Sequence, residues 1–458
     1  MKKVLALGLI ITLALTVLLS GCQTQTDTST QTQEGGGNSG GRTKLAMWFW
    51  GCSDAYQKAL NENLAGRYNA MQDQYELVIE YRETVDNDIS VAIAANSGPD
   101  VVYGSGPAWV ANYAKSGKLE SLAPYVEEYG WRDKLMSPLY EACTVDGELY
   151  SIPISLNTVG LYYSKSVLEE NDWAVPTTID ELYTVMDEAQ AKGMYAALAG
   201  NKGWRANNEV YTTLFLNHFA GPEVVYRCLT GEQKWNTPDV QNAVRTSADW
   251  YKKGYLGGND YTNISAGEAM ALLASGKSPF VISSSQFFQF ANEYFNDEAG
   301  NTDDLGFAPF PGTDKAQYPT FSIGTVATFS VNASTSHKDE AAKILNIMIS
   351  KDFMTDMTIA WPGYWGVPLR EMNIDMSRMS GLSLAYSELL TTMNKTVNAG
   401  NFAYFVQTFF PSATYEHTND IDTVWEGVAS PEEFLSDMDI KFQKDLDANL
   451  VPPIPKVK

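Results

Sequence analysis

Aromatic and acidic side chains occur where two predicted strands end and helices begin. Trp50 closes a predicted strand over 44–49, and Asp54 lies at the start of the helix that follows. Trp109 comes shortly after the buried run 101–103 and a glycine-rich loop. Ligands of open α/β sheets bind just beyond the carboxyl ends of the strands, so all three residues are candidates for a binding rim. The alternatives are a packing anchor for each Trp and a helix cap for Asp54.

Motifs of enzymes and of metal sites are missing from the sequence. His218, His337 and His417 share no motif, and neither HExxH nor a P-loop occurs. Glycine patterns that begin at Gly35 and Gly37 match a dinucleotide fingerprint and a nucleophile elbow, but no strand precedes them and no helix follows. The numerous acidic residues leave a glycosidase-like carboxylate pair open, although no particular pair stands out. The expectation is no catalytic residue, no metal and no cofactor.

The cysteines beyond the N-terminus are Cys52, Cys143 and Cys228. They are far apart and lack the CxxC spacing of a zinc site. A single disulfide among them stays open, because sequence alone does not reveal the pairing.

Composition argues against a nucleic-acid partner. The 458 residues include 32 Lys+Arg and 55 Asp+Glu, which gives a formal net charge of −23. Such a charge opposes binding to phosphate backbones and to anionic membrane surfaces. It favours a soluble domain, which we expect to be a monomer. The length allows two or three domains. An aromatic content of 12%, with 11 Trp and 25 Tyr, requires an explanation.

The N-terminus has the features of a targeting segment. Lys2 and Lys3 precede an apolar run over 4–19, which is shorter than the about 20 residues of a spanning helix. The run ends in Leu-Ser-Gly-Cys22, which resembles a bacterial lipobox; the alternative is an ordinary signal with a chance Cys. We expect a lipoprotein signal peptide over 1–21, a lipid on Cys22 and a flexible tether over 22–43. This predicts anchoring to the extracellular face of a bacterial membrane, with a Gram-positive source favoured.

Periodicity then predicts alternating strands and helices. Strands are expected over 44–49, 76–81 and 101–103, with helices that begin near Asp54, Val85 and Trp109. This βαβαβα order predicts a parallel sheet with helices on both faces. Farther along, Thr178 with Glu181 and Ser430 with Glu433 have the spacing of capping boxes at helix starts.

Several motifs resemble one known family. These are GPDVV at 98–102, YAKSGKLESL at 113–122, G-x-L-Y-x-I-P at 147–153 and Y-Y-x-K at 162–165. In this order they are similar to the extracellular solute-binding proteins of ABC transporters, in the carbohydrate-binding group that includes maltose-binding protein. The resemblance extends over about 44–446.

The resemblance implies a fold and a division into lobes. The fold would be α/β and periplasmic-binding-protein-like, with two lobes, each a mostly parallel sheet flanked by helices, joined by several hinge crossings. The N-terminal lobe would comprise 44–154 and 310–362, and the C-terminal lobe 155–309 and 363–450. Lobes of this kind close on a ligand by hinge bending.

The resemblance also adds candidate residues for a cleft. Asn157 would face it near the first crossing. Many relatives carry Gly-x-Trp after the strand at 280–282, whereas this chain has no Trp there, so either a polar edge of Ser285 and Gln286 or the ring of Phe287 would replace the stacking platform. Trp204 lies in a predicted loop, and Tyr364 and Trp365 lie in a loop rich in Pro and Gly, which is a poor place for core.

A sugar ligand would explain the aromatic residues, because a pyranose has an apolar C–H face and a rim of hydroxyls. The resemblance implies a substrate-binding component of an ABC importer that captures a di- or oligosaccharide and delivers it to permease subunits without turnover. The rival hypotheses are a surface glycoside hydrolase and a carbohydrate-binding adhesin.

Overall fold

The computed structural model describes residues 41–203 and 208–457. The chain divides into a unit that ends at Gly41 and a second unit, Arg42–Lys458, to which everything below refers. Within the described residues, no helix combines the length and the apolar character that a membrane span requires.

The first sheet has the strand order β2-β1-β3-β12-β6. Its strands are β1 (Thr43–Trp50), β2 (Tyr75–Arg82), β3 (Val101–Gly104), β6 (Ile152–Pro153) and β12 (Thr328–Val331). β1 is parallel to β2 and β3, which confirms the parallel pairing predicted from the sequence, and β12 is antiparallel to β3 and β6. β1 forms from a continuous apolar run, in which Leu45, Met47 and Phe49 point to one face and are fully buried while the alternate residues are half-buried.

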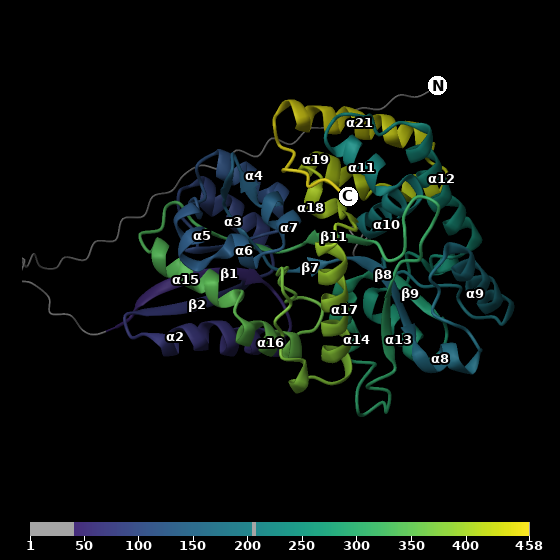
Figure 1. The fold of residues 1–458 in the computed structure, drawn as a ribbon, viewed down its shortest axis with the longest axis horizontal. Helices are drawn as coiled ribbons and strands as arrows, with labels where there is room; N and C mark the ends of the chain where they lie inside the picture. Colours follow the sequence, from purple (N-terminus) through teal and green to yellow (C-terminus); the bar gives the residue numbers. More distant parts are fainter. Residues whose placement is uncertain (1–40, 204–207, 458) are drawn as a thin grey trace, which may run out of the picture. The chain divides into compact units, whose positions relative to one another are not determined.

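Helices surround this sheet (Figure 1). They are α1 (Asp54–Leu60), the π-helical segment η1 (Asn61–Gly66), α2 (Arg67–Met71), α3 (Val85–Ala94), α4 (Pro107–Lys115), α5 (Ala123–Tyr129), α6 (Trp131–Lys134), α7 (Ser137–Ala142), α15 (Lys338–Met348) and α16 (Lys351–Ala360). The cap predicted at Asp54 is wrong by one residue. Ser53 caps α1 by accepting a hydrogen bond from the backbone N–H of Tyr56, and Asp54 occupies the first helical turn.

The second sheet has the order β10-β8-β9. Its strands are β8 (Val159–Ser164), β9 (Phe280–Ser284) and β10 (Leu305–Pro309), and both pairings are antiparallel. The expectation of mostly parallel strands in this half is therefore wrong. The reason is topological, because β8 leads the chain away from the first sheet and β10 leads it back.

Two smaller sheets complete the strands. One has the order β13-β11-β7, with β7 (Leu156–Asn157), β11 (Phe321–Thr325) and β13 (Phe402–Tyr404). β11 is parallel to β13 and antiparallel to β7. The other is the hairpin of β4 (Thr144–Val145) and β5 (Glu148–Leu149).

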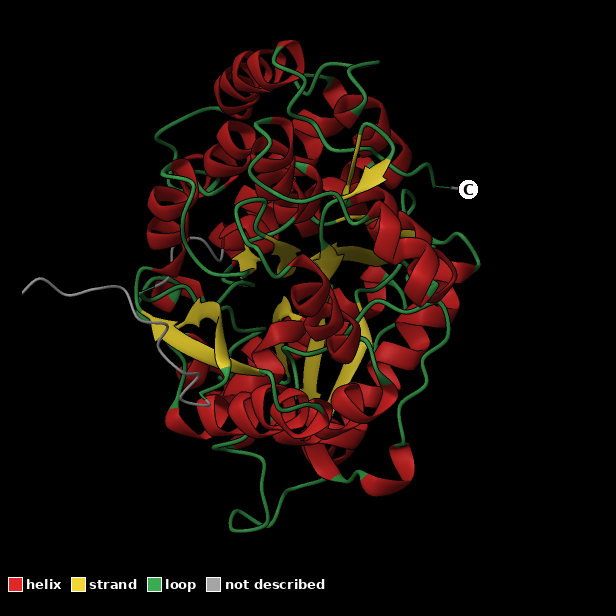
Figure 2. Ribbon diagram, turned by 90° about the vertical axis from the view of Figure 1, so that its left-hand side faces the viewer, coloured by secondary structure: helices red, strands yellow, loops and turns green. Residues whose placement is uncertain are grey.

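The second half is mainly helical, and Figure 2 shows helices on the outer sides of the strands. Its α-helices are α8 (Lys165–Glu170), α9 (Ile179–Ala191), α10 (Asn208–Phe215), α11 (Pro222–Leu229), α12 (Pro238–Lys253), α13 (Ala266–Ala274), α14 (Phe288–Ala291), α17 (Gly381–Asn398), α18 (Val406–Phe409), α19 (Ser412–Thr418), α20 (Asp422–Trp425) and α21 (Pro431–Asp447). Shorter helical segments are η3 (Leu216–Ala220), η4 (Gly258–Asp260), η5 (Ser285–Phe287) and η6 (Met376–Arg378). The capping boxes predicted at the starts of α9 and α21 are both confirmed.

Two large hydrophobic cores lie under these sheets. The first contains β1, β3 and β12 with their helices, and the second contains β8 and β9 with α10, α12 and α17. The chain passes between them at 154–156, where Ile154 belongs to the first core and Leu156 to the second. It passes again between Val326 and Ala327, and a third time between Leu369 and Leu382.

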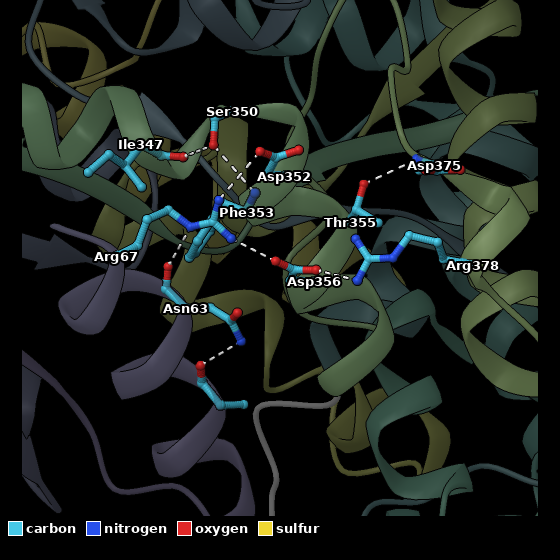
Figure 3. A network of polar contacts seen from close by, with 11 residues as sticks. Asn63, Arg67, Ile347, Ser350, Asp352, Phe353, Thr355, Asp356, Asp375 and Arg378 are labelled. Atoms are coloured by element: carbon cyan, nitrogen blue, oxygen red, sulfur yellow. Dashed lines mark hydrogen bonds and ion pairs between the residues drawn. The ribbon is translucent and has the colours of Figure 1, made fainter. Parts of the chain in front are cut away.

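An ion-pair network braces α2 against α16 and the turn that precedes α17 (Figure 3). The guanidinium of Arg67 donates to Asp356 Oδ2 at 2.6 Å and lies 3.6 Å from Asp352 Oδ2. Arg378 donates to Asp356 Oδ1 at 2.7 Å. Both oxygens of Asp356 therefore contact a cation.

Candidate functional site

A cavity of about 620 Å³ lies between residues of the two cores. One wall is formed by Trp50, Tyr103 and Trp109 at the ends of the parallel strands and by Asp86 and Ser105 beside them. The opposite wall comes from α10, from 286–290 and from 407–416. Its volume is in the range of cavities that bind small molecules, and ligands of α/β sheets bind at this end of the strands.

Stacked rings brace the first wall. The indole Nε1–H of Trp50 donates to the hydroxyl of Tyr364 at 2.9 Å. Tyr364 stacks on Trp361 with ring centroids 4.8 Å apart, and Trp361 stacks on Tyr56 at 4.1 Å. Burial raises the pKa of the Tyr103 and Tyr364 phenols well above the usual value, so both hydroxyls stay protonated at physiological pH. The aromatic part of this wall is thus uncharged, and the Asp86 carboxyl lies beside it.

Trp109 depends on a glycine for its position. Its ring lies over Gly104 at the end of β3, where an added Cβ would come within 2.6 Å of the indole. The ring also packs on Tyr113, with centroids 4.2 Å apart. Only a residue without a side chain at this strand end allows the half-buried indole to lie against the backbone and still reach the cavity.

Gln289 connects the second wall to the first. Its backbone carbonyl accepts a hydrogen bond from the Tyr56 hydroxyl at 2.9 Å, and its side-chain oxygen accepts from Trp361 Nε1 at 3.3 Å. Gln407 makes a further link, because its amide donates to the carbonyl of Ser105 at 3.3 Å. Both glutamines line the cavity, so the polar groups of its two walls already meet at their edges.

The charged group with the most unusual surroundings is Glu209, at the start of α10. It lines the cavity, its exposed fraction is 4%, and its Oε2 has no hydrogen-bond partner. Burial raises the pKa of this carboxyl to about 8; the Tyr415 hydroxyl lowers that pKa by hydrogen bonding, and the charge of Glu416 raises it. The sequence analysis missed Glu209, and its one signal was an acidic residue in an otherwise uncharged helix, all of which is buried.

The cavity lining carries acids but no base among the described residues. Asp86, Glu209 and Glu416 line it, and no Lys, Arg or His does. The described residues contain no group of His, Cys, Asp and Glu side chains that could hold a metal ion. The three cysteines that left a disulfide open are all free thiols.

Four of the residues predicted from the sequence line the cavity together, namely Trp50, Trp109, Gln286 and Tyr364. They come from β1, α4, η5 and the loop after α16. Residues that are far apart in the sequence therefore border the same cavity.

Four other predicted residues, Asn157, Ser285, Trp365 and Asp54, are not in the lining. Asn157 and Ser285 are buried and bind one another, since the Ser285 hydroxyl donates to Asn157 Oδ1 at 2.7 Å. Trp365 is fully buried in the first core and packs on Phe49. Asp54 is exposed on α1. Trp204 and Cys22 lie outside the described residues.

The comparison with family models identifies one match. Residues 53–355 match the model of the bacterial extracellular solute-binding proteins. Among individual sequences, the maltotriose-binding protein of Pyrococcus abyssi is 32% identical over 127 residues, which are 28% of this chain and 27% of that protein. The multiple sugar-binding protein of Streptococcus mutans is 26% identical over 215 residues, or 44% of this chain and 48% of that protein. The chain thus spans half or less of the length of these curated relatives.

Solved structures have the same fold. A protein from work on xylan utilization by Caldanaerobius polysaccharolyticus is 20% identical with a TM-score of 0.73, over 87% of this chain and 99% of that one. A chitin oligosaccharide binding protein is 20% identical with a TM-score of 0.72, over 88% of this chain and 98% of that one. These similarities confirm the two-lobed α/β fold class predicted from the sequence. The chain belongs to the family of bacterial extracellular solute-binding proteins.

Proposed function

We propose that this chain is the lipid-anchored substrate-binding component of an ABC importer, and that it captures a sugar of two or more rings in the cavity between its two cores. The observation that carries the proposal is the braced aromatic wall of Trp50, Trp109 and Tyr364, which faces polar groups across a cavity of about 620 Å³. Aromatic faces bury the C–H side of a pyranose, while glutamines and hydroxyls bind its rim. The named ligands of several relatives, among them maltotriose and multiple sugars, support this ligand class.

Delivery would follow from closure. A ligand that touches both walls favours the closed arrangement, because only there does it make both sets of contacts. The closed form would then be recognised by the permease subunits. Cys22 would carry the lipid that holds the protein, as a monomer, on the extracellular face of the membrane.

Titration of the intrinsic tryptophan fluorescence tests the ligand class. The panel contains maltotriose, raffinose, diacetylchitobiose and a xylo-oligosaccharide, with amino acids as the negative arm. We expect a saturable shift with at least one sugar, and a smaller radius of gyration in small-angle scattering at saturation. New reducing ends after incubation would instead support a hydrolase, and a sugar response without any change in scattering would support an adhesin.

Gly104→Ala tests the aromatic wall. The added methyl must displace the Trp109 indole, so we expect the affinity for the responding sugar to fall at least about tenfold, as it should for Trp109→Ala. Gly66→Ala is the matched control, because a Cβ there meets only the Asn61 carbonyl at 3.4 Å and lies in a helical segment. Unchanged affinity in both Gly104→Ala and Trp109→Ala would remove this wall from the site.

A further inference from the structure

The cavity contains a carboxyl group whose environment favours its neutral form. Glu209 is enclosed by the second core, and the elements packed around α10 supply no described cation to it. The ionisable groups that act on it are Tyr415 and Glu416, both on α19, while Asp86 lines the cavity farther along the opposite wall. All of these either are acids or can only donate a neutral hydrogen bond, so no described residue nearby compensates a negative charge on Glu209.

One oxygen of the Glu209 carboxyl lacks a hydrogen-bond partner among the described residues. The Tyr415 hydroxyl donates to the Glu209 carboxyl. Oε2 is buried, has no partner and belongs to a side chain that lines the cavity. In the neutral acid one oxygen accepts from Tyr415, which leaves an O–H on the other that requires an acceptor. A buried polar group without a partner is costly, and a ligand oxygen is the acceptor that this position lacks.

We propose that Glu209 in its protonated form is a ligand-contacting residue, which donates a hydrogen bond to a hydroxyl, ring or acetyl oxygen of an uncharged sugar and makes sugar capture weaken as the pH rises. This inference rests on the proposed function and deepens it by defining the ligand as neutral. An anionic sugar would meet Asp86, Glu416 and any ionised Glu209 without a described cation in the lining. Sugars that carry a carboxylate should therefore bind poorly.

The pH profile of affinity is the first test. Burial raises the pKa of Glu209 to about 8, so the neutral acid is nearly fully populated at pH 6 and about a tenth populated at pH 9. If only that form binds, the apparent Kd of the responding sugar rises about tenfold between these pH values. Calorimetry in buffers of different ionisation enthalpy should also detect proton uptake on binding at pH 8.5, roughly 0.7 proton per ligand.

Glu209→Gln is the decisive variant, because its amide keeps the size and a donor without the titration. We expect an affinity at pH 6 within about threefold of that of the unmodified protein, no pH dependence up to pH 9 and no proton uptake. Glu209→Ala should weaken binding at pH 6 roughly tenfold, the loss of one hydrogen bond to a buried group. Glu170→Gln, at an exposed position on α8, is the matched control and should retain the pH profile of the unmodified protein.

The outcomes separate this inference from the proposed function. Sugar binding that is independent of pH, with no proton uptake, overturns the role of Glu209 but leaves the binding function standing. Affinity that rises with pH, together with a response to a glucosamine disaccharide, would show that an ionised Glu209 binds a cationic amino sugar. The absence of a response to any sugar at any pH would overturn the proposed function itself. Because the pH series on the unmodified protein needs no variant, the test stands even if Glu209→Ala fails to fold.

Discussion

The carboxyl groups of Asp356 and Glu209 lie in opposite environments. Asp356 receives the guanidinium of Arg67 on one oxygen and that of Arg378 on the other, and its side chain keeps an exposed fraction of 22% (Figure 3). Glu209 is 4% exposed, and its Oε2 has no hydrogen-bond partner among the described residues. Cations thus bind the carboxyl of Asp356, whereas burial favours the neutral form of Glu209.

The difference separates a structural carboxyl from a functional one. The Asp356 side chain is partly exposed to solvent and is bound by two cations, so it links helices at little desolvation cost. A carboxyl buried without a cation makes folding less favourable at neutral pH, and selection for stability alone would replace it. Its position in the cavity wall gives the reason for its presence, because groups with strongly perturbed pKa values are found preferentially at functional sites.

The largest effect expected from this comparison is on stability. The pKa of Glu209 is raised in the folded state. With respect to this group, the free energy of unfolding is therefore highest below the unfolded pKa near 4.5, and it falls as the pH rises toward about 8. Glu209→Gln removes that loss. We expect its free energy of unfolding to exceed that of the unmodified protein by about 4 kcal/mol at pH 8 and by about 1 kcal/mol at pH 5, since each unit of pKa shift corresponds to about 1.4 kcal/mol.

Urea unfolding at both pH values measures this difference. Asp356→Asn serves as the opposite case, because it removes a charge that two guanidiniums bind, and it should destabilise the protein at both pH values. If Glu209→Gln proved destabilising at pH 8, the carboxyl would be ionised and compensated in the folded protein, and the contrast between the two sites would disappear.

Disrupting the ion-pair network of Arg67, Asp356 and Arg378 should have a smaller effect on the free energy of unfolding. Arg67→Ala removes the ion pair with Asp356 and a hydrogen bond to the Asn63 carbonyl, and it leaves Arg378 on the other oxygen. We expect a loss of about 1 to 2 kcal/mol in the free energy of unfolding, which shrinks in high salt, with sugar affinity unchanged. Arg42→Ala is the matched control. Its partner Asp73 is almost fully exposed, so its loss should be below about 0.5 kcal/mol. Equal losses in both variants would mean that the network adds nothing beyond a surface ion pair.

Much of the fold could be predicted because its signals are local. The apolar run of β1, the buried run of β3 and the capping box at Thr178 each depend on neighbouring residues, and each is present in the structure. The strand directions of the second sheet could not be predicted in this way. They depend on β10 returning beside β8 after about 140 residues, which is a property of the whole chain path.

For the site, the sequence indicated which loops reach the cavity but not which side chains enter it. Tyr364 and Trp365 are adjacent in one loop, yet the first lines the cavity and the second is buried in the core. Asn157 and Ser285 are polar residues near the predicted cleft, but they satisfy one another inside the protein. Glu209 was missed because its burial and its unpaired oxygen arise from packing against α19, far along the chain.

The smallest expected effect comes from Glu416, the acidic neighbour of Glu209, and concerns the pKa of Glu209. Glu416 raises the pKa of Glu209 by charge repulsion, where Asp356 has cations instead. Glu416→Gln should therefore lower that pKa, so that sugar affinity begins to fall at a pH a few tenths of a unit lower than in the unmodified protein. Because Glu416 is exposed, salt screens its charge, and 0.5 M NaCl should move the profile of the unmodified protein in the same direction while leaving that of Glu416→Gln nearly unchanged. Fluorescence titrations at half-unit pH steps resolve the shift, and a profile that moved to higher pH in Glu416→Gln would contradict the repulsion on which the assignment of Glu209 depends.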